Sequence, residues 1–217
     1  NQPLSATLTY ARAAQRLLAA PRMDEAKVRA AMDGAATQAE RAGLIIRTLR
    51  DFIGRGELQR EVHSLAALIY DAVALMRPEC QRSGIHLEIS LDRGIPPVEV
   101  DAVQIQQVLV NLIRNAAEVL EKFDGSRIIL VTTRLNDDGD AEIEVADSGP
   151  GLADDMADGV FRPFTTTKAE GMGLGLSISR TIIDAHGGRL WLAASGPDGC
   201  AFRFTLATQS PRHEGAK

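Results

Sequence analysis

Aromatic residues are scarce in this 217-residue sequence, at 4% of the chain, with only one tryptophan. Apolar residues as a whole reach 45%, so we expect a core of aliphatic side chains and alanine. The two cysteines, Cys80 and Cys200, are too few for a disulfide framework or a zinc knuckle. We therefore interpret both as buried, reduced thiols.

Long apolar runs and an excess of positive charge are also absent. No stretch approaches the ~20 residues that span a bilayer, and no signal peptide opens the chain. We therefore expect no direct membrane contact and a cytoplasmic location, whether the protein is soluble or is part of a membrane-anchored one. The formal net charge is −5, which argues against a nucleic-acid partner because such surfaces are usually basic. A nucleotide would need only one local cation.

The first part of the chain has helical periodicity. Residues 4–20 carry apolar side chains at spacings of three and four, and Asp24 has the side chain of an N-cap for a second helix over 24–54. Together they predict an antiparallel helical hairpin over residues 1–56. A second copy would cover its apolar stripes in a four-helix bundle. The alternative is that the hairpin folds back on the rest of the same chain.

The pattern changes after a predicted linker, residues 57–64. A mixed domain follows over 65–208, and the polar tail 209–217 is expected to be disordered. We expect helices over 65–82, 102–122 and 172–186, and strands over 85–91, 128–135, 141–145, 189–194 and 201–206. This inventory predicts an α/β sandwich with helices on one face of a largely antiparallel sheet. The whole chain is therefore expected to be α+β.

Two asparagines share one face of the helix predicted over 102–122. Asn111 and Asn115 are four residues apart on an otherwise apolar helix, although asparagine is a mediocre helix former. A carboxamide oxygen is a suitable ligand for Mg²⁺. The simpler interpretation is that both side chains cap neighbouring loops.

An acidic residue and two glycines follow the strand predicted over 141–145. The sequence Asp147-Ser148-Gly149-Pro150-Gly151 places a carboxylate where it can accept a hydrogen bond from an exocyclic amine such as that of adenine. Gly149 and Gly151 let the backbone come close to a ligand. The alternative is an ordinary tight turn.

Two further clusters complete the set. Phe161 and Phe164 can pin a loop to the core, and Thr166 and Lys168 can meet phosphate oxygens; a surface loop with two core anchors is the alternative. The sequence Gly171-Met172-Gly173-Leu174-Gly175 then opens a helix, whose first N–H groups suit a phosphate. No strand directly precedes these glycines, so a Rossmann site is not indicated.

In this order the four clusters resemble the N, G1, F and G2 boxes of sensor histidine kinases. These belong to the Bergerat-fold ATPases, together with gyrase, the large heat-shock chaperone ATPases and MutL. The resemblance covers about residues 65–207. It implies that the chain binds ATP with Mg²⁺ and transfers the γ-phosphoryl group to a histidine.

The resemblance also implies a role for each site residue. Asn115 matches the asparagine that coordinates Mg²⁺, and Asp147 the acid that reads the adenine amine. Asn111 stands where gyrase-like relatives place a glutamate as hydrolytic base; an amide cannot take a proton from water, so hydrolysis is suppressed. The remaining matches are Gly149 and Gly151 at the base, Phe161, Phe164, Thr166 and Lys168 in the nucleotide lid, and Gly171, Gly173, Leu174 and Gly175 facing the phosphates.

The first residues resemble the end of an H box of the form H-E-x-N-Q-P-L. The acceptor histidine would then lie three residues before Asn1, and Gln2 would take the position at which related kinases keep a side chain used in dephosphorylating the partner. None of the four histidines in the sequence lies in such a context. We therefore expect this chain to bind ATP without phosphorylating itself.

The resemblance implies three partners: a second copy bound through the hairpin, a response-regulator receiver domain and an upstream sensor domain. Two other functions remain open. One is an ATPase clamp of the gyrase type, although Asn111 replaces the base that it needs. The other is a nucleotide-dependent dimeric interaction module without kinase activity.

Overall fold

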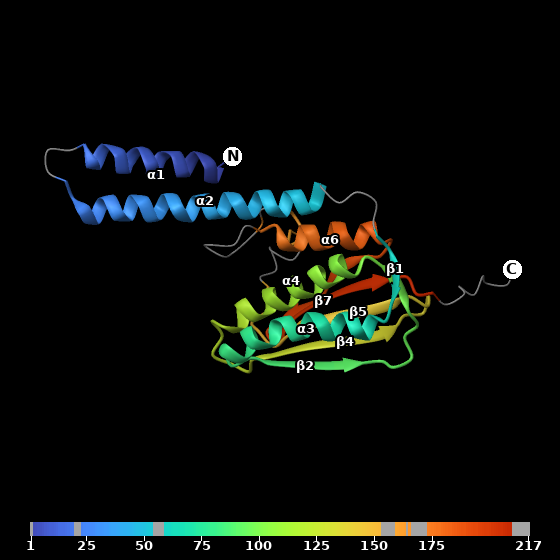
Figure 1. Ribbon diagram of the computed structural model, residues 1–217. Coiled ribbons are helices and arrows are strands. Elements are labelled where there is room, and N and C mark those ends of the chain that lie inside the picture. The colour runs from blue at the N-terminus through green and yellow to red at the C-terminus, as the bar shows by residue number, and fades with distance from the viewer. Residues whose placement is uncertain are drawn as a thin grey trace. The chain divides into compact units, whose positions relative to one another are not determined.

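The computed structural model describes residues 2–19, 23–53, 59–152, 159–163, 165 and 173–209. The chain divides into two compact units, Asn1–Glu57 and Leu58–Lys217 (Figure 1). In the described part of the chain, no helix combines the length and the apolar character that a membrane crossing requires.

The first unit is a pair of helices, α1 (Gln2–Leu18) and α2 (Glu25–Ile53), which lie side by side. The predicted N-cap is confirmed, because the carboxylate of Asp24 accepts a hydrogen bond from the backbone N–H of Lys27 at 3.2 Å. Tyr10 lies so close to Gly34 that a Cβ there would come within 2.9 Å of two ring carbons. A glycine inside a helix is unfavourable by about 1 kcal/mol relative to alanine, and this ring contact explains why it is present.

Large apolar side chains remain exposed on the hairpin. Ala14, Val28 and Ala31 are buried between the helices. The exposed side chains are those of Leu8, Tyr10, Leu18, Met23 and Met32. Within the described residues the hairpin therefore leaves apolar surface uncovered, while the second copy remains a prediction.

The second unit packs helices on one face of a five-stranded sheet with the order β2-β4-β5-β7-β6. Among the strand pairs of this sheet in the described residues, β2–β4 is parallel and the others are antiparallel. The strands are β2 (His86–Leu91), β4 (Ile128–Leu135), β5 (Ala141–Asp147), β6 (Leu190–Gly196) and β7 (Gly199–Leu206). The helices are α3 (Leu65–Arg82), α4 (Ala102–Leu120) and α6 (Gly175–Ala185), all on the same side of the sheet (Figure 1). The predicted α/β sandwich is confirmed.

Helix α4 is the centre of the helical layer, packed against α3, α6 and the sheet. It begins after the N-cap Asp101, whose carboxylate accepts from the N–H of Gln104 at 3.1 Å. Its apolar residues recur at helical spacing and point into the core. The buried ones are Ile105, Val108, Leu109, Leu112, Ile113, Ala116, Ala117 and Leu120.

The predicted linker contains a strand that the sequence pattern did not indicate. Strand β1 (Glu61–His63) pairs antiparallel with β3 (Val98–Val100) in a separate two-stranded sheet. At the other end, the N–H of Gln209 donates to the carbonyl of Pro97 at 2.9 Å, so hydrogen-bonded structure runs one residue into the predicted tail. Residues 210–217 of that tail lie outside the described part.

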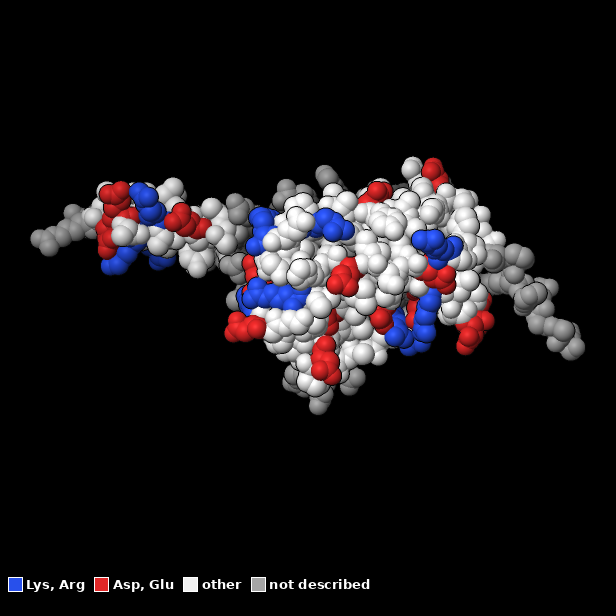
Figure 2. Space-filling view, turned by 90° about the horizontal axis from the view of Figure 1, so that it is seen from below, with Lys and Arg blue, Asp and Glu red and all other residues white. Residues whose placement is uncertain are grey.

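The outer face of the sheet carries polar and aromatic side chains. Glu142 is only 7% exposed there and binds the guanidinium of Arg134 at 2.6 Å, with Arg203 at 3.6 Å. Trp191 lies opposite Arg203 in the strand register, and the guanidinium of Arg189 lies 5.6 Å from its ring centre. On the face shown in Figure 2, the described acidic and basic side chains are interspersed.

Candidate nucleotide site

The first part of the site is formed where α4 meets the beginning of α6. Asn111 and Asn115 are half-buried on one face of α4. The side-chain amide of Asn111 donates to Ser179 Oγ on α6 at 2.9 Å. A Cβ on Gly175 would collide with Asn111 Oδ1. Only glycine therefore lets the first turn of α6 come this close to the carboxamide.

The same face of α4 leads on to the end of β5. Val119 is two turns after Asn111, and its Cγ1 would lie 3.1 Å from a Cβ on Gly149. Asn115 lies between them and makes no side-chain hydrogen bond within the described residues. At 1.5 Å of rise per residue, Asn111, Asn115 and Val119 form a row about 12 Å long. We call these three residues the α4 row.

Asp147 is the last residue of β5 and is half-buried. Burial raises its pKa, while hydrogen bonds from the backbone N–H groups of Gly149 and Cys200 act in the opposite direction. The bond from Gly149 to Asp147 Oδ1 is 2.8 Å long. The carboxylate of Asp147 is thus held in a fixed orientation at the end of β5. Gly149, which binds it, also lies next to Val119 of the α4 row.

Cys200 is the β7 residue that pairs with Asp147. Burial, and then the negative charge of Asp147, raise the pKa of the Cys200 thiol to about 12. The thiol is therefore protonated at neutral pH. This agrees with the expected reduced, buried cysteine, and Cys80 is buried as well.

The segment after Asp147 is fastened to the edge strand β6. Gly151 has φ of 73°, and a Cβ there would collide with the backbone of Gly196. The N–H of Leu152 donates to Ser195 Oγ at 2.7 Å. Gly151 is therefore required by the close approach of two backbones, as well as by its conformation.

Phe161 anchors the next described segment to the sheet and to α6. Its ring meets that of Phe202 edge-on with 6.1 Å between centres, and the guanidinium of Arg180 lies 5.3 Å from its centre. The expected role of an aromatic anchor therefore has a structural basis at this position. Four other predicted lid and glycine residues, Phe164, Thr166, Lys168 and Gly171, lie outside the described residues.

Helix α6 begins at Gly175 rather than at residue 172, because Gly173 has a left-handed φ of 61°. The N-cap is Leu174, which has no side chain able to accept a hydrogen bond from the first turn. Among the described residues, no side chain caps this end of the helix. Its first N–H groups are therefore available to an anion.

Two residues of the site were not predicted from the sequence. Ser179 is 2% exposed among the apolar residues that α6 buries, and a lone hydroxyl on an apolar helix face signals that a partner is present. Val119 gave no signal, because it resembles any core residue. Gln2 is the first residue of α1, in the other unit, and its side chain lies outside the described part.

The α4 row carries two carboxamides and connects a glycine-rich helix start with no side-chain cap to a half-buried acid at a strand end. This combination defines the Bergerat class of ATP-binding folds. The family model described as histidine kinase-, DNA gyrase B- and HSP90-like ATPase matches residues 100–210. The chain belongs to this family, and its second unit is an ATP-binding core of the sensor histidine kinase type.

Several sensor proteins are similar over nearly the whole chain. The sensor protein FixL of Bradyrhizobium diazoefficiens is 48% identical over 95% of this chain. The C4-dicarboxylate transport sensor protein DctS of Rhodobacter capsulatus is 38% identical over 95% of it. The matches cover 41% and 31% of the lengths of these two relatives.

Solved structures agree with the fold. The catalytic domain of the histidine kinase ThkA matches 69% of this chain and 95% of its own, with a TM-score of 0.60 and 32% identity. Histidine kinase ThkA in complex with the response regulator protein TrrA matches 94% of this chain and 57% of its own, with a TM-score of 0.68 and 25% identity.

Proposed function

We propose that this chain is the catalytic core of a two-component sensor histidine kinase. It transfers the γ-phosphoryl group of ATP to a histidine, from which the group passes to an aspartate of a response-regulator receiver domain. The observation that carries the proposal is the α4 row, which connects the uncapped start of α6 to the strand-end acid Asp147. A nucleotide can lie along it with its phosphates at α6 and its base at β5.

The base is read by Asp147. Its carboxylate accepts a hydrogen bond from the exocyclic amine of adenine, and the bond from Gly149 holds it in place. Burial raises the pKa of this carboxyl because it removes water from around the charge. A partner that donates a hydrogen bond restores what the ionised carboxylate has lost, which favours the binding of an amine there.

The phosphates lie at the start of α6, where the backbone from Gly173 to Gly175 presents N–H groups. Lys168 and Thr166 add contacts from the lid, which Phe161 and Phe164 anchor. In phosphoryl transfer the protein mainly positions the reactants and compensates their charge. These backbone and side-chain groups are suited to that task and need no acid or base of their own.

Magnesium is expected with the nucleotide, and the residues present fit it. Among the described residues, no group of three histidine, cysteine or acidic side chains is placed to hold a metal ion. A metal here would therefore depend on Asn115 and on substrate phosphates, the mode of binding that Mg²⁺ favours. The half-buried Asn115 side chain, with no hydrogen bond to another described residue, is the ligand. When bound, Mg²⁺ offsets phosphate charge.

Asn111 directs the chemistry away from hydrolysis. Its amide is hydrogen-bonded to Ser179, and an amide cannot act as a general base toward water. The site can therefore hold ATP until the acceptor histidine arrives. This residue favours a kinase over an ATPase clamp of the gyrase type.

The helical hairpin pairs with a second copy to form a homodimer. Its exposed apolar side chains, such as Leu8 at 52% and Met32 at 58%, support this assembly. Gln2 stands at its first turn, as the residue used in dephosphorylation. A response-regulator receiver domain and an upstream sensor domain are the other proposed partners.

The three described histidines, His63, His86 and His186, belong to the second unit and not to the helical hairpin, and His213 lies outside the described residues. His186 is 6% exposed, with both ring nitrogens in hydrogen bonds. His86 belongs to β2, and His63 lies 3.9 Å from Glu61 in β1. We therefore propose that the acceptor belongs to the H box, outside the sequence given, and that this chain alone does not phosphorylate itself.

Binding of ATP with Mg²⁺, measured by calorimetry, tests the site. Asn115→Ala and Asp147→Ala are expected to abolish binding, whereas Asn136→Ala, in the turn between β4 and β5, is expected to bind as the wild type does. Wild-type affinity in either site variant would refute the proposed nucleotide site. Transfer of labelled phosphate from ATP should appear only in a protein extended to include the H-box histidine.

A further inference from the structure

The strand β1, which lies within the predicted linker of residues 57–64, is paired with the strand that leads into α4. Glu61 pairs with Val100 and His63 with Val98 of β3. Strand β3 leads directly into Asp101, the N-cap of α4. The first strand of the second unit is therefore hydrogen-bonded to the strand that precedes the helix carrying Asn111 and Asn115.

A second contact joins the same segment to α6. Arg60, the residue before β1, donates a hydrogen bond from Nη2 to the carbonyl of Ala185 at 2.6 Å. Ala185 is the last residue of α6. The final carbonyls of a helix lack partners within the helix and carry its negative end, so a guanidinium there is stabilising. The two residues are 125 positions apart in the sequence.

His186 completes the junction between the two helices. The N–H of Asp101 donates to Nε2 of His186 at 3.0 Å, and Nδ1 of the same ring lies 2.8 Å from the carbonyl of Ile182. A backbone N–H can only donate, so Nε2 accepts and the proton is on Nδ1. The imidazole thus joins the end of α6 to the beginning of α4.

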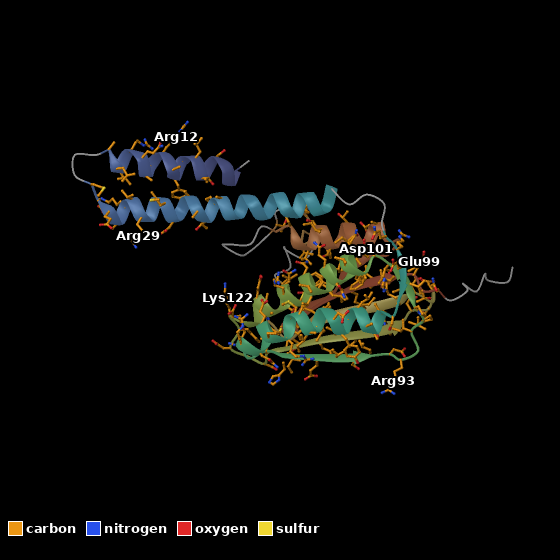
Figure 3. The ribbon with its side chains drawn as sticks, viewed as in Figure 1. Arg12, Arg29, Arg93, Glu99, Asp101 and Lys122 are labelled. Atoms are coloured by element: carbon orange, nitrogen blue, oxygen red, sulfur yellow. The ribbon has the colours of Figure 1, made fainter. Side chains whose placement is uncertain are left out.

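The two helices run in opposite directions and are joined by hydrogen bonds at two places. Midway along α4 Asn111 binds Ser179, and at the start of α4 Asp101 binds His186. Figure 3 labels Asp101 and Glu99 at the end of the domain where α6 finishes and β1 runs. Arg60, Asp101, Ala185 and His186 form what we call the base junction, which lies at the start of α4 and the end of α6.

We propose that Arg60 is a positioning residue that couples the linker strand to nucleotide binding. It acts through Ala185 and His186, which set how α6 lies along α4 and hence where Gly175 stands beside Asn111. A nucleotide that fixes the start of α6 will stabilise the base junction and β1. By thermodynamic linkage, holding β1 in place raises nucleotide affinity by the same factor. This inference rests on the proposed ATP site.

Hydrogen exchange in the whole 217-residue chain tests the coupling. Exchange of the β1 and β3 amides is measured with and without ATP and Mg²⁺, beside ATP affinity by calorimetry. In the wild type we expect nucleotide to slow exchange in β1. In Arg60→Gln that slowing should be lost and ATP affinity should fall three- to tenfold, while Arg60→Lys, which keeps the charge and a donor, should retain part of both.

Arg82→Gln is the matched control. Arg82 is an exposed arginine that also donates to a carbonyl in the last turns of a helix, from Nε to Pro78 at 3.4 Å, but it lies on α3. It should keep wild-type affinity and protection. The effect of ATP on each variant is the ratio of its exchange rates with and without the nucleotide. A variant that is only less stable exchanges faster in both states, so its ratio is not expected to change as it does when coupling is lost.

Two results overturn the inference. One is a wild-type protein that binds ATP without any change of exchange in β1. The other is Arg60→Gln with wild-type protection and affinity. In both cases the ATP site itself stands, whereas a wild-type chain that binds no ATP would refute the proposed function instead.

Discussion

The substitution Gly149→Ala tests the proposal that Asp147 reads adenine. A Cβ at residue 149 would lie 2.7 Å from Asp147 Oδ1 and 3.1 Å from Val119 Cγ1. The first distance is too short for a carbon and an oxygen that are not bonded, so the carboxylate must move. Its 2.8 Å hydrogen bond from the residue 149 N–H is then lengthened, and its alignment with the nucleotide is lost.

A hydrogen bond to a charged group contributes about 1.5–3 kcal/mol. Since 1.4 kcal/mol corresponds to about a factor of ten in affinity, we expect ATP to bind about ten to a hundred times more weakly to Gly149→Ala. Gly149 is not among the glycines with positive φ. Alanine therefore fits its backbone, and the loss of unfolding free energy should come from the close contacts of its Cβ with Asp147 and Val119, at about 1–3 kcal/mol.

The matched control is Gly139→Ala in the turn between β4 and β5. This glycine has φ of 81° and no atom within 4 Å of the added carbon. The left-handed backbone should cost about 1–2 kcal/mol of stability and leave ATP affinity unchanged. Calorimetry and denaturant unfolding of both variants give the test, and an affinity within twofold of the wild type for Gly149→Ala would refute the reasoning.

Two further predictions concern the same site. Asn111→Ala and Ser179→Ala should be non-additive in unfolding free energy by about 1 kcal/mol, because each removes the same hydrogen bond; combining Asn111→Ala with Thr181→Ala should be additive, and an additive first pair would contradict the contact. Burial raises the pKa of Asp147 above 3.8, so the folded state binds its proton more tightly than the unfolded chain, and ionisation costs stability as pH rises through the raised pKa. Without nucleotide, Asp147→Asn should therefore raise the midpoint of denaturant unfolding at pH 7 but not at pH 3. An unchanged midpoint at pH 7 would show that the ionised carboxylate does not destabilise the fold.

Most of the longer helices and strands could be predicted, because the spacing of apolar residues and the capping side chains are local features of the sequence. Helix α3 matches its predicted bounds, and α4 ends two residues early. The strand β4 also has its predicted bounds. Each of these elements has a strong apolar period, and α4 has a capping side chain in addition.

The short strands β1 and β3 could not be predicted. Each has three residues, too few to show an alternating pattern. They are strands because they pair with each other across the chain, which is a tertiary effect that local propensity does not contain. The linker prediction failed at residues 61–63 for this reason.

The residues of the site were predictable as types but not as contacts. Asn111 and Asp147 are conspicuous in the sequence. Their partners are not: Ser179 is 68 positions from Asn111, and Cys200 faces Asp147 only because β7 is inserted between β5 and β6. Sheet order and helix packing create these pairs, and neither is encoded in a local pattern.

The single tryptophan of the sequence is a built-in optical probe. Trp191 lies between Leu190 and Leu192, both of which face the core, so its indole is directed to the opposite side of the sheet. Its fluorescence emission should therefore change when the sheet unfolds and remain unchanged when ATP binds. An experimenter can follow unfolding and ligand binding as separate signals in one unlabelled sample.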